Sequence, residues 1–436
     1  MPPLGLAYVA SVLKQAGHSP EILDLDVTRK RVDFTTYDLV GISALTPTYP
    51  NALTIAQACA RKGVPVAMGG YHPTFMDGEA LGTGWVNYVV RGEGEYILLD
   101  LLDYLGGKKP IERVAGISYR RKGEVKRNAA ALPVHDLDSI PLPARELLEM
   151  EKYNATLNES RMTSVITSRG CPFNCHFCSS SRFGGKKWRS RSAESVLDEL
   201  GRLKEDYSYR AVNFIDDNFT LNPKRTIEIC EGMIEKKLGM SWLALSRPET
   251  IVKHEPMVER MAEAGAYMVF LGMESGSEET LRGYHKTVGT DQFYKAVKML
   301  SQYNIKTWAS FMIGALNETR DMIVKTLNFA RKLNPHAVQF SILTPYPGTD
   351  LFEKVRGRLL TRNWKIFDGT HPIFKPDNIS EKELRPLLRA AYSSFYIRPA
   401  KLCKEFELAV RNRRLLKTLA RGFFRGLRMN LFLQSG

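Results

Sequence analysis

The stretch Ser168-Arg169-Gly170-Cys171-Pro172-Phe173-Asn174-Cys175-His176-Phe177-Cys178 decides how the rest of this chain is organised. Three of the six cysteines of the chain fall within it, at C-x3-C-x2-C spacing. This spacing brings three thiolates onto one short loop and supplies no fourth thiolate. We therefore expect Cys171, Cys175 and Cys178 to bind a metal centre that keeps one coordination position open.

Other interpretations of this loop are weaker. A structural zinc ion needs four closed ligands, so His176 would have to serve from an awkward position between the cysteines. Thiols this dense in a cysteine-poor chain are rarely mere packing. The chain shows no signal peptide, which indicates a reducing cytosol and disfavours a disulfide framework. Thiolate loops of this kind hold iron–sulfur clusters, and with three cysteines one iron of a four-iron cluster stays free.

Length and composition are those of a large soluble enzyme, which we expect in the cytoplasm. The 436 residues are enough for two or three domains, and 44% hydrophobic residues are enough for their cores. No run of about 18 apolar residues occurs, so we expect no membrane-spanning helix. The net charge of +15 invites a nucleic-acid partner, but much of this charge lies in one segment near the C-terminal end.

Residues 1–105 alternate between strand and helix patterns. We expect helices at 3–13 and 51–62 and strands at 20–25, 39–43, 65–68 and 87–90. This alternation predicts an α/β, doubly wound, Rossmann-like sheet, which binds ligands at the carboxyl ends of its strands. Polar or glycine-rich loops follow those ends at residues 43–49, 69–74 and 91–95. Glycine lets a backbone approach a bulky ligand closely, so a binding crevice is expected there.

Residues 106–160 are expected to form a connector with a hairpin around Lys122-Gly123.

From 161 to 355 the alternation of strand and helix patterns resumes with longer helices. Strands are expected at 164–167, 211–215, 241–245, 267–271, 307–312 and 337–343. Six such units predict a partial (β/α)6 TIM barrel, whose chemistry lies at the carboxyl ends of its strands.

Unusual polar residues follow the barrel strands. They are Asp216, Asp217, Arg247, Glu274, Ser275, Gly314 and Tyr346. Helix capping is the alternative role for Asp216, Asp217 and Ser275. Arg247 and Glu274 are stronger candidates, because inward charges at a barrel mouth need partners. Tyr346 is the candidate catalytic, substrate-facing residue, and packing onto the C-terminal region is its alternative.

The cysteine loop resembles the signature of the radical S-adenosylmethionine (SAM) enzymes, and Phe177 stands where that motif carries an aromatic residue. The resemblance implies a [4Fe-4S] cluster whose open iron binds SAM, together with an external low-potential electron donor. It also implies that Phe177, Asp216 and Asp217 lie at the SAM site. By the same resemblance Glu274 and Ser275 hydrogen-bond SAM, Arg247 pairs with its carboxylate, and Gly314 admits its adenine.

The sequences Pro-Pro-Leu-Gly-Leu-Ala-Tyr, Gly-Gly-Tyr-His-Pro-Thr and Gly-Glu-Gly-Glu resemble the cobalamin-binding domain that precedes many radical SAM domains. Two features depart from it. Met1 directly precedes the first sequence, so the usual first strand is expected to be missing or the start to be truncated. Asp-x-His-x-x-Gly does not occur either, so we expect cobalamin without a lower histidine ligand and keep His72 as an alternative ligand. The cofactor-binding residues implied are Pro3, Leu4, Gly5, Ser43, Thr46, Gly69, Gly70, His72, Thr74, Gly92, Glu93 and Gly94.

Residues 356–436 are expected to form a helical C-terminal extension, with a helix at 381–395 capped by Ser380. From Arg398 onward ten Lys or Arg stand against two Glu, a net charge of +8. On a helical wheel one side gathers Leu415, Leu416, Leu419, Phe423 and Leu427, and the other gathers Arg414, Lys417, Arg421, Arg425 and Arg428. This pattern predicts peripheral contact with an anionic membrane or an acidic protein, with docking onto the barrel as the alternative. Nucleic acid is not expected as a partner.

The two resemblances together imply a cobalamin-dependent radical SAM methyltransferase. A 5′-deoxyadenosyl radical would take hydrogen from an unactivated sp3 carbon, methylcobalamin would supply the methyl group, and a second SAM would restore it. A cobalamin-dependent enzyme that does not methylate, such as an oxidative cyclase or a lipid-modifying enzyme, is the alternative. A non-catalytic iron–sulfur module and a chain that no longer holds cobalamin also stay open. The substrate expected is a protein or peptide, a lipid or a small molecule.

Overall fold

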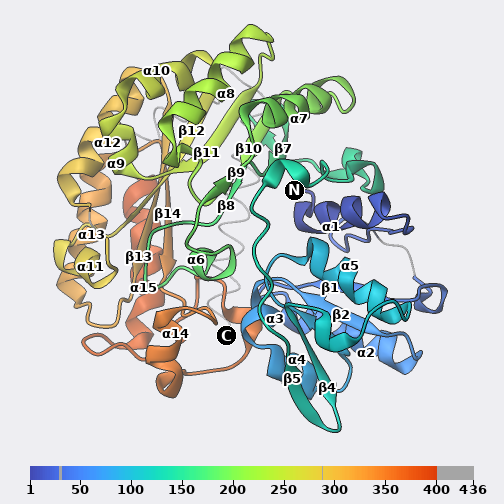
Figure 1. Ribbon diagram of the computed structural model, residues 1–436. Coiled ribbons are helices and arrows are strands. Elements are labelled where there is room, and N and C mark those ends of the chain that lie inside the picture. Colours follow the sequence, from blue (N-terminus) through green and yellow to red (C-terminus); the bar gives the residue numbers. More distant parts are fainter. Residues whose placement is uncertain (29–31, 287, 400–436) are drawn as a thin grey trace.

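The computed structural model describes residues 1–436 except 29–31, 287 and 400–436, and it contains two main sheets (Figure 1). The five-stranded sheet has the order β1-β2-β3-β4-β5. Its first three strands are parallel, and β4 and β5 continue it as the antiparallel hairpin expected in the connector. The strands are β1 (Val40–Ser43), β2 (Val66–Gly69), β3 (Tyr88–Val90), β4 (Ile117–Arg121) and β5 (Glu124–Arg127).

Helices cover both faces of this sheet, as the doubly wound prediction requires. Alternate residues of β2 explain why: Met68 packs with α2, whereas Ala67 packs with α5. The helices of this half are α1 (Leu4–Gln15), α2 (Tyr49–Arg61), α3 (Tyr71–Phe75), α4 (Asp77–Gly82) and α5 (Gly94–Leu105).

The strand expected at residues 20–25 is wrong. Residues 20–24 have no regular structure and a turn follows them. Ile22 and Val27 explain the difference, because they pack against the core of the second sheet and not against the first. This segment crosses between the two halves, so its backbone does not pair with the edge strand β1.

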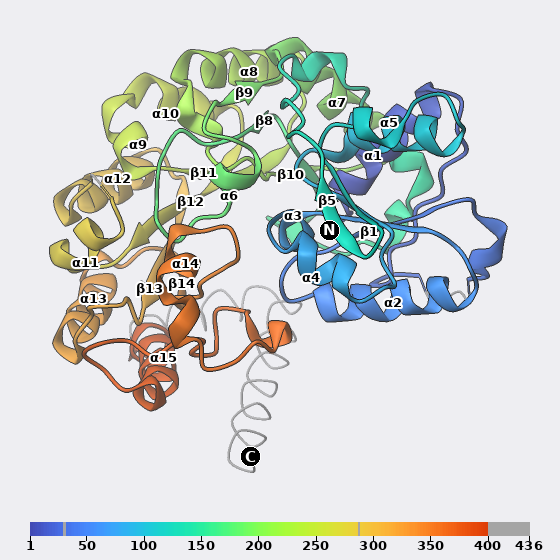
Figure 2. The same cartoon turned by 60° about the horizontal axis from the view of Figure 1, so that its bottom comes forward.

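The second sheet curls into a half-barrel of seven strands, in the order β14-β13-β12-β11-β10-β7-β6, with helices along its outside (Figures 1 and 2). The six strands expected are present and parallel. They are β7 (Ser160–Val165), β10 (Ala211–Phe214), β11 (Ser241–Ser246), β12 (Ala266–Glu274), β13 (Lys306–Ile313) and β14 (Ala337–Ile342), and the short β6 (Thr156–Leu157) pairs antiparallel to β7.

The outer helices begin at polar caps and bury one apolar face against the strands. Ser192 caps α7 and Asn222, followed by a proline, caps α8. The helices are α7 (Ala193–Glu205), α8 (Pro223–Glu235), α9 (Pro248–Lys253), α10 (Glu255–Glu263), α11 (Glu278–Gly283), α12 (Thr290–Gln302) and α13 (Arg320–Leu333).

The segment after β14 returns to the first sheet. Phe352, Trp364 and Phe367 join the core beneath α2, and the indole N–H of Trp364 donates to Glu79 Oε1 over 2.7 Å. Phe352 lies on α14 (Asp350–Val355), and the chain ends its described part with α15 (Glu381–Tyr396), which Ser380 caps in a full capping box as expected. The basic segment expected to be amphipathic lies at 400–436, outside the described residues. No described helix has the length and apolar character to cross a membrane.

Candidate functional site

The cysteine loop leaves the barrel through a narrow neck. After β7, the two-residue strands β8 (Ser168–Arg169) and β9 (Arg189–Ser190) pair antiparallel, and the chain between them carries the cysteines and the short α6 (Ser180–Phe183). Gly170 is required at the neck, because its φ is +82° and a Cβ there would lie 2.6 Å from the Lys187 carbonyl oxygen. The loop is therefore closed at its base.

The three cysteines fit an iron–sulfur cluster. Each is a free thiol of intermediate exposure. Burial raises the pKa of Cys171 to about 11 and also raises that of Cys178, so their thiolates need a cationic partner such as iron. Within the described part of the chain, no group of three or more His, Cys, Asp or Glu residues could hold a single metal ion.

Asp216 and Asp217 follow β10 and serve different partners. Asp216 is buried and accepts hydrogen bonds from the backbone N–H and hydroxyl of Thr167 and from the hydroxyl of Ser168. It therefore fixes the entry to the cysteine loop and does not cap the following helix. Burial raises the pKa of Asp217, which hydrogen-bonds Ser180 just after the last cysteine.

Arg247, after β11, lies over the ring of Phe173 inside the cysteine loop, with its guanidinium carbon 3.6 Å from the ring centroid. Its Nε donates to Glu249. Phe177 contacts Tyr284 edge to face at 5.2 Å. The Tyr284 side chain is buried, and its hydroxyl has no hydrogen-bond partner among the described residues. These aromatic contacts place Arg247 and Phe177 at the same mouth of the barrel as the cysteines.

Glu274 ends β12 in a strained conformation. Its φ is +66° and the register with β13 shifts between Gly272 and Glu274, as at a β-bulge. The carboxylate pairs with Lys286 Nζ at 3.0 Å, and both side chains are nearly buried. Ser275 contacts Thr326, oxygen to oxygen, at 2.9 Å and accepts from the Ser277 N–H. The bulge thus aims a buried ion pair at the barrel mouth.

Gly314 directly follows β13 and has a φ of +84°. Its N–H and that of Ala315 donate to Glu318 Oε2 at 2.6 and 3.0 Å. Burial raises the pKa of Glu318 to about 7, although these hydrogen bonds oppose the shift. Glu318 therefore holds the turn at this strand end in shape.

On the cobalamin side, Gly70 brings the ends of β1 and β2 together. Its φ is +95°, and a Cβ would lie 2.7 Å from the Ala44 carbonyl oxygen. The loops after β2 and β3 are joined by the Gly92 N–H, which donates to Thr74 Oγ1 over 3.1 Å. The three strand ends thus form one continuous edge, with Ser43 exposed and Gly69 partly buried on it.

His72 is fully buried at this edge. Its ring lies 4.1 Å from that of Tyr49 and 4.8 Å from that of Trp364, and Nδ1 lies 3.3 Å from Thr46 Oγ1. Burial lowers the pKa of His72 to about 3, and Nε2 has no hydrogen-bond partner among the described residues. His72 is thus a neutral imidazole between aromatic rings.

Pro3, Leu4 and Gly5 start α1. Leu4 is buried with Tyr8 and Val12, whereas Gly5 has nothing within 4 Å of an added Cβ. No close approach inside the described chain therefore requires glycine at position 5.

The two edges meet at the cysteine loop. Gly94 begins α5, and the preceding Glu93 pairs with Arg189 and also lies 3.5 Å from Arg169. The ring of Tyr71, after β2, stacks on Phe183 of α6 with centroids 4.2 Å apart and planes at 15°. The carboxyl edge of the first sheet thus lies against the loop that would hold the cluster.

Tyr346, the candidate substrate-facing residue, follows β14 and is only partly buried. Its ring is partly buried against the core shared by α2, Phe352 and Trp364. Burial raises the pKa of its hydroxyl. This contact agrees with the packing alternative for Tyr346.

Sequence reasoning missed Tyr71, Glu95, Arg169, Lys286 and Glu318 as members of these edges. Glu95 and Tyr71 stood inside loops already singled out, and Arg169 adjoins the cysteine motif. The charge of Arg169 next to the cysteine motif was a signal that could have identified it as part of the site. Lys286 carried no such signal, because it lies beyond the C-terminal end of α11 and is not next to any motif, and only the fold brings it to Glu274.

The fold and the cysteine loop define a radical SAM enzyme with a second cofactor domain. Residues 165–330 match the Radical SAM superfamily and residues 1–102 match the B12 binding domain. The chain is 38% identical to an uncharacterized methyltransferase of Pyrococcus horikoshii over 93% of this chain and 90% of the relative. It is 30% identical to the anaerobic magnesium-protoporphyrin IX monomethyl ester cyclase of Rubrivivax gelatinosus, over 97% of this chain and 79% of that enzyme.

Among solved structures, the radical SAM methyltransferase TsrM from Kitasatospora setae, with cobalamin and a [4Fe-4S] cluster bound, matches with a TM-score of 0.70. The identity is 19%, over 81% of this chain and 75% of that one, so this likeness concerns the fold. The chain belongs to the cobalamin-dependent radical SAM enzymes. Its cofactors are a [4Fe-4S] cluster, SAM and cobalamin.

Proposed function

We propose that this enzyme transfers a methyl group to an unactivated sp3 carbon. When bound, the cluster and SAM supply a 5′-deoxyadenosyl radical, and cobalamin carries the methyl group. The observation that carries the proposal is the contact between the two edges, in which Tyr71 and Glu93 of the first sheet touch the cysteine loop. A substrate bound at this junction would lie between the residues that would hold the two cofactors. The uncharacterized methyltransferase of Pyrococcus horikoshii, similar over most of its length, supports methyl transfer without specifying the acceptor.

The residues of this chain would position SAM and exclude water. Cys171, Cys175 and Cys178 would ligate three irons. Arg247 offers a guanidinium for the SAM carboxylate, and the Tyr284 hydroxyl is a buried polar atom free to face a ligand. Gly92 would admit the corrin edge to the backbone, because nothing in the chain lies within 4 Å of a Cβ added there, and Gly70 would hold the ends of β1 and β2 together beside it.

We propose an apolar substrate. Along the barrel strands, alternate residues face the outer helices, so the intervening ones face inward. Leu245, Phe270 and Trp308 are on this inner face and are partly exposed, and the rings of Phe270 and Trp308 contact edge to face at 5.2 Å. Ser310 and Gln339 on the same face carry no charge, and its charged side chain on β13, Lys306, lies at the amino end of that strand, away from the barrel mouth. A lipid or an aromatic small molecule fits this wall better than an acidic peptide does.

The test is anaerobic turnover of the reconstituted enzyme with methyl-labelled SAM and a reducing, low-potential electron donor. Each methyl transferred should be accompanied by one 5′-deoxyadenosine and one S-adenosylhomocysteine, and should consume two electrons. Label in the product supports methylation. An oxidised or cyclised product without label, formed with 5′-deoxyadenosine, would instead support the cyclase activity that the Rubrivivax gelatinosus relative suggests.

Peripheral contact with an anionic membrane or an acidic protein through residues 400–436 stays part of this proposal, and so does an external electron donor. The support is the sequence pattern of the basic segment. Sedimentation with anionic and with neutral vesicles, using the full chain and a chain ending at residue 399, tests the membrane contact. Equal sedimentation of the two chains with anionic vesicles would argue against it.

A further inference from the structure

The neck of the cysteine loop is held by a buried group of four charges. Both arginines of the neck, Arg169 on β8 and Arg189 on β9, reach the loop between β3 and α5. Arg169 Nη2 donates to Glu95 Oε1 over 2.6 Å. Arg189 donates to both carboxylate oxygens of Glu93, over 2.5 and 3.0 Å. The four side chains are only 4% to 15% exposed.

These contacts have a geometry that fixes direction as well as distance. A guanidinium that meets a carboxylate with two parallel hydrogen bonds is held in plane, as Arg189 is on Glu93. Arg189 also donates to the carbonyls of Val134 and Gly184. Both strands of the neck are therefore anchored to the first sheet by oriented bonds.

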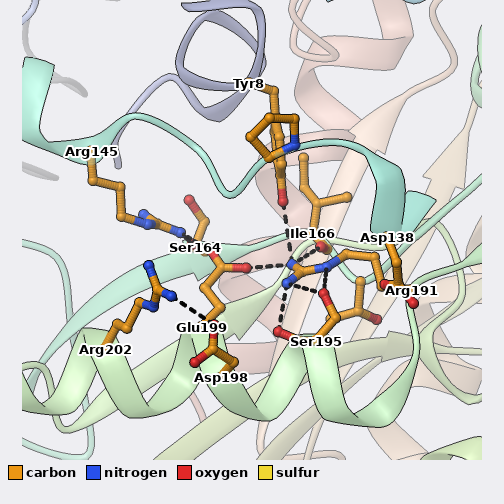
Figure 3. Close-up of polar contacts among 12 residues, drawn as sticks. Tyr8, Asp138, Arg145, Ser164, Ile166, Arg191, Ser195, Asp198, Glu199 and Arg202 are labelled. Atoms are coloured by element: carbon orange, nitrogen blue, oxygen red, sulfur yellow. Dashed lines mark hydrogen bonds and ion pairs between the residues drawn. The ribbon is translucent and has the colours of Figure 1, made fainter. Parts of the chain in front are cut away.

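A second set of arginines joins the end of the neck to α7 of the barrel (Figure 3), and Tyr8 links it to Arg169, which lies 5.4 Å from the centre of the Tyr8 ring. Arg191 donates to the Ile166 carbonyl, to Glu199 and to the Tyr8 hydroxyl. Arg145 donates to the other oxygen of Glu199 over 2.6 Å. On the barrel side, the carboxylate of Glu199 is thus paired with Arg145 and Arg191. Glu93 and Glu95 pair instead with the arginines of the neck and tie it to the first half of the molecule.

Stability alone does not account for the four charges. Desolvating buried ion pairs costs about as much as their attraction returns, and apolar residues of similar volume often stabilise equally well. What oriented ion pairs add is a single, defined arrangement of the parts that they join. The parts joined here are the loop of the cluster and the strand-end loop of the cobalamin domain.

We propose that Glu93 and Glu95 are positioning residues that set the distance and orientation between the iron–sulfur cluster and cobalamin by holding Arg169 and Arg189 at the neck. The proposal does not depend on which reaction the enzyme performs. It concerns the geometry of the two cofactors, for which placement within about 1 Å matters to reacting groups.

The experiment measures that geometry directly. With both cofactors loaded and reduced, the cluster and cob(II)alamin each carry one unpaired spin, and their dipolar coupling in pulsed electron paramagnetic resonance reports distance and spread. Wild type should give one narrow distribution. Glu93→Gln with Glu95→Gln keeps the side-chain shapes and removes both charges, and the distribution should become at least about twofold broader because several arrangements are then populated.

The matched control is Glu146→Gln. It removes an ion pair of similar length, Lys14 to Glu146 at 2.7 Å, whose side chains are 55% and 50% exposed. The coupling should stay as in wild type. If the double variant binds both cofactors and keeps the narrow distribution, even with a lower melting temperature, the four charges serve stability only and the proposal is overturned.

Hydrogen exchange decides the case in which the double variant loses a cofactor. In the full chain without cofactors, the neck amides hydrogen-bonded between β8 and β9 should exchange at least about tenfold faster in Glu95→Gln than in wild type. Amides of α7, held by the Glu199 side, should be unchanged. Unaltered exchange at the neck would overturn the proposal.

Discussion

The carboxyl ends of the strands in the two sheets meet at one junction, but the two edges carry different kinds of side chain. The edge of the first sheet consists of glycines with positive φ, a neutral histidine between aromatic rings, and glutamates already paired to arginines. The edge of the half-barrel carries three free thiols and two carboxyls, Asp217 and Glu318, whose pKa values burial raises.

This difference indicates a division of labour. The first edge is a preformed surface on which a large cofactor can lie, because close backbone approach and packing dominate there. The second edge holds groups that bind metal and whose charge burial disfavours. Substitutions should therefore act through shape on the first edge and through charge or ligation on the second.

The largest effect is expected at the second edge. Cys178→Ala removes a cluster ligand, so iron content and reductive cleavage of SAM should be abolished while cobalamin binding persists. Iron and cobalt analysis with a 5′-deoxyadenosine assay measures this. Cys59→Ala, at a buried thiol on α2, is the control, and the protein should keep its iron. A Cys178→Ala protein that still cleaves SAM would contradict the ligand assignment.

Gly70→Ala tests shape at the first edge. Its Cβ would meet the Ala44 carbonyl at 2.7 Å in a conformation reserved for glycine, so we expect a loss of about 3 to 5 kcal/mol in the free energy of unfolding. Denaturant unfolding measures it. Gly41→Ala on β1 has nothing within 4 Å of the new Cβ and is the control. Equal free energies of unfolding for the two variants would contradict the close contact between Gly70 and Ala44 at the ends of β2 and β1.

Glu318→Gln tests charge at the second edge. Burial raises the pKa of this carboxyl from 4.5 to about 7, so the folded protein binds more protons than the unfolded chain between these values. Stability should therefore fall as pH rises through this window, by about 3 kcal/mol in total. In Glu318→Gln, the free energy of unfolding should no longer decrease with pH in this window, which denaturant unfolding at several pH values measures. Glu278→Gln is the sign control, because hydrogen bonds from Thr290 lower the pKa of Glu278 and its stabilisation is lost as pH falls.

His72→Phe tests the aromatic surroundings of the first edge, with the smallest expected effect. Burial lowers the pKa of His72 from 6.5 to about 3, so the unfolded chain binds the proton first as pH falls below 6.5. Wild type should lose about 2 kcal/mol between pH 7 and pH 5 through this group. The variant should lose less. His135→Phe, at an exposed histidine, is the control, and an unchanged pH slope in His72→Phe would argue that the ring is not buried in solution.

Local pattern in the sequence was enough for the elements that depend on neighbours along the chain. The C-x3-C-x2-C spacing predicted the metal centre, the six barrel strands were found within a few residues, and Ser380 was recognised as a helix cap. Periodicity, caps and ligand spacing depend on residues close together in the sequence, so they can be recognised without knowledge of the fold.

Only the tertiary structure decided what long-range packing controls. Residues 20–25 read as a strand, but Ile22 and Val27 pack on the other half of the molecule and leave no partner strand. Arg169 meets Glu95 across 74 positions and Arg189 meets Glu93 across 96. No local rule specifies which distant charge a side chain will meet, because that depends on how the two sheets come together. The sequence by itself determined the cofactors and most of the strands, and it predicts the cluster ligands from spacing alone; the tertiary structure decided how the two cofactor edges are joined.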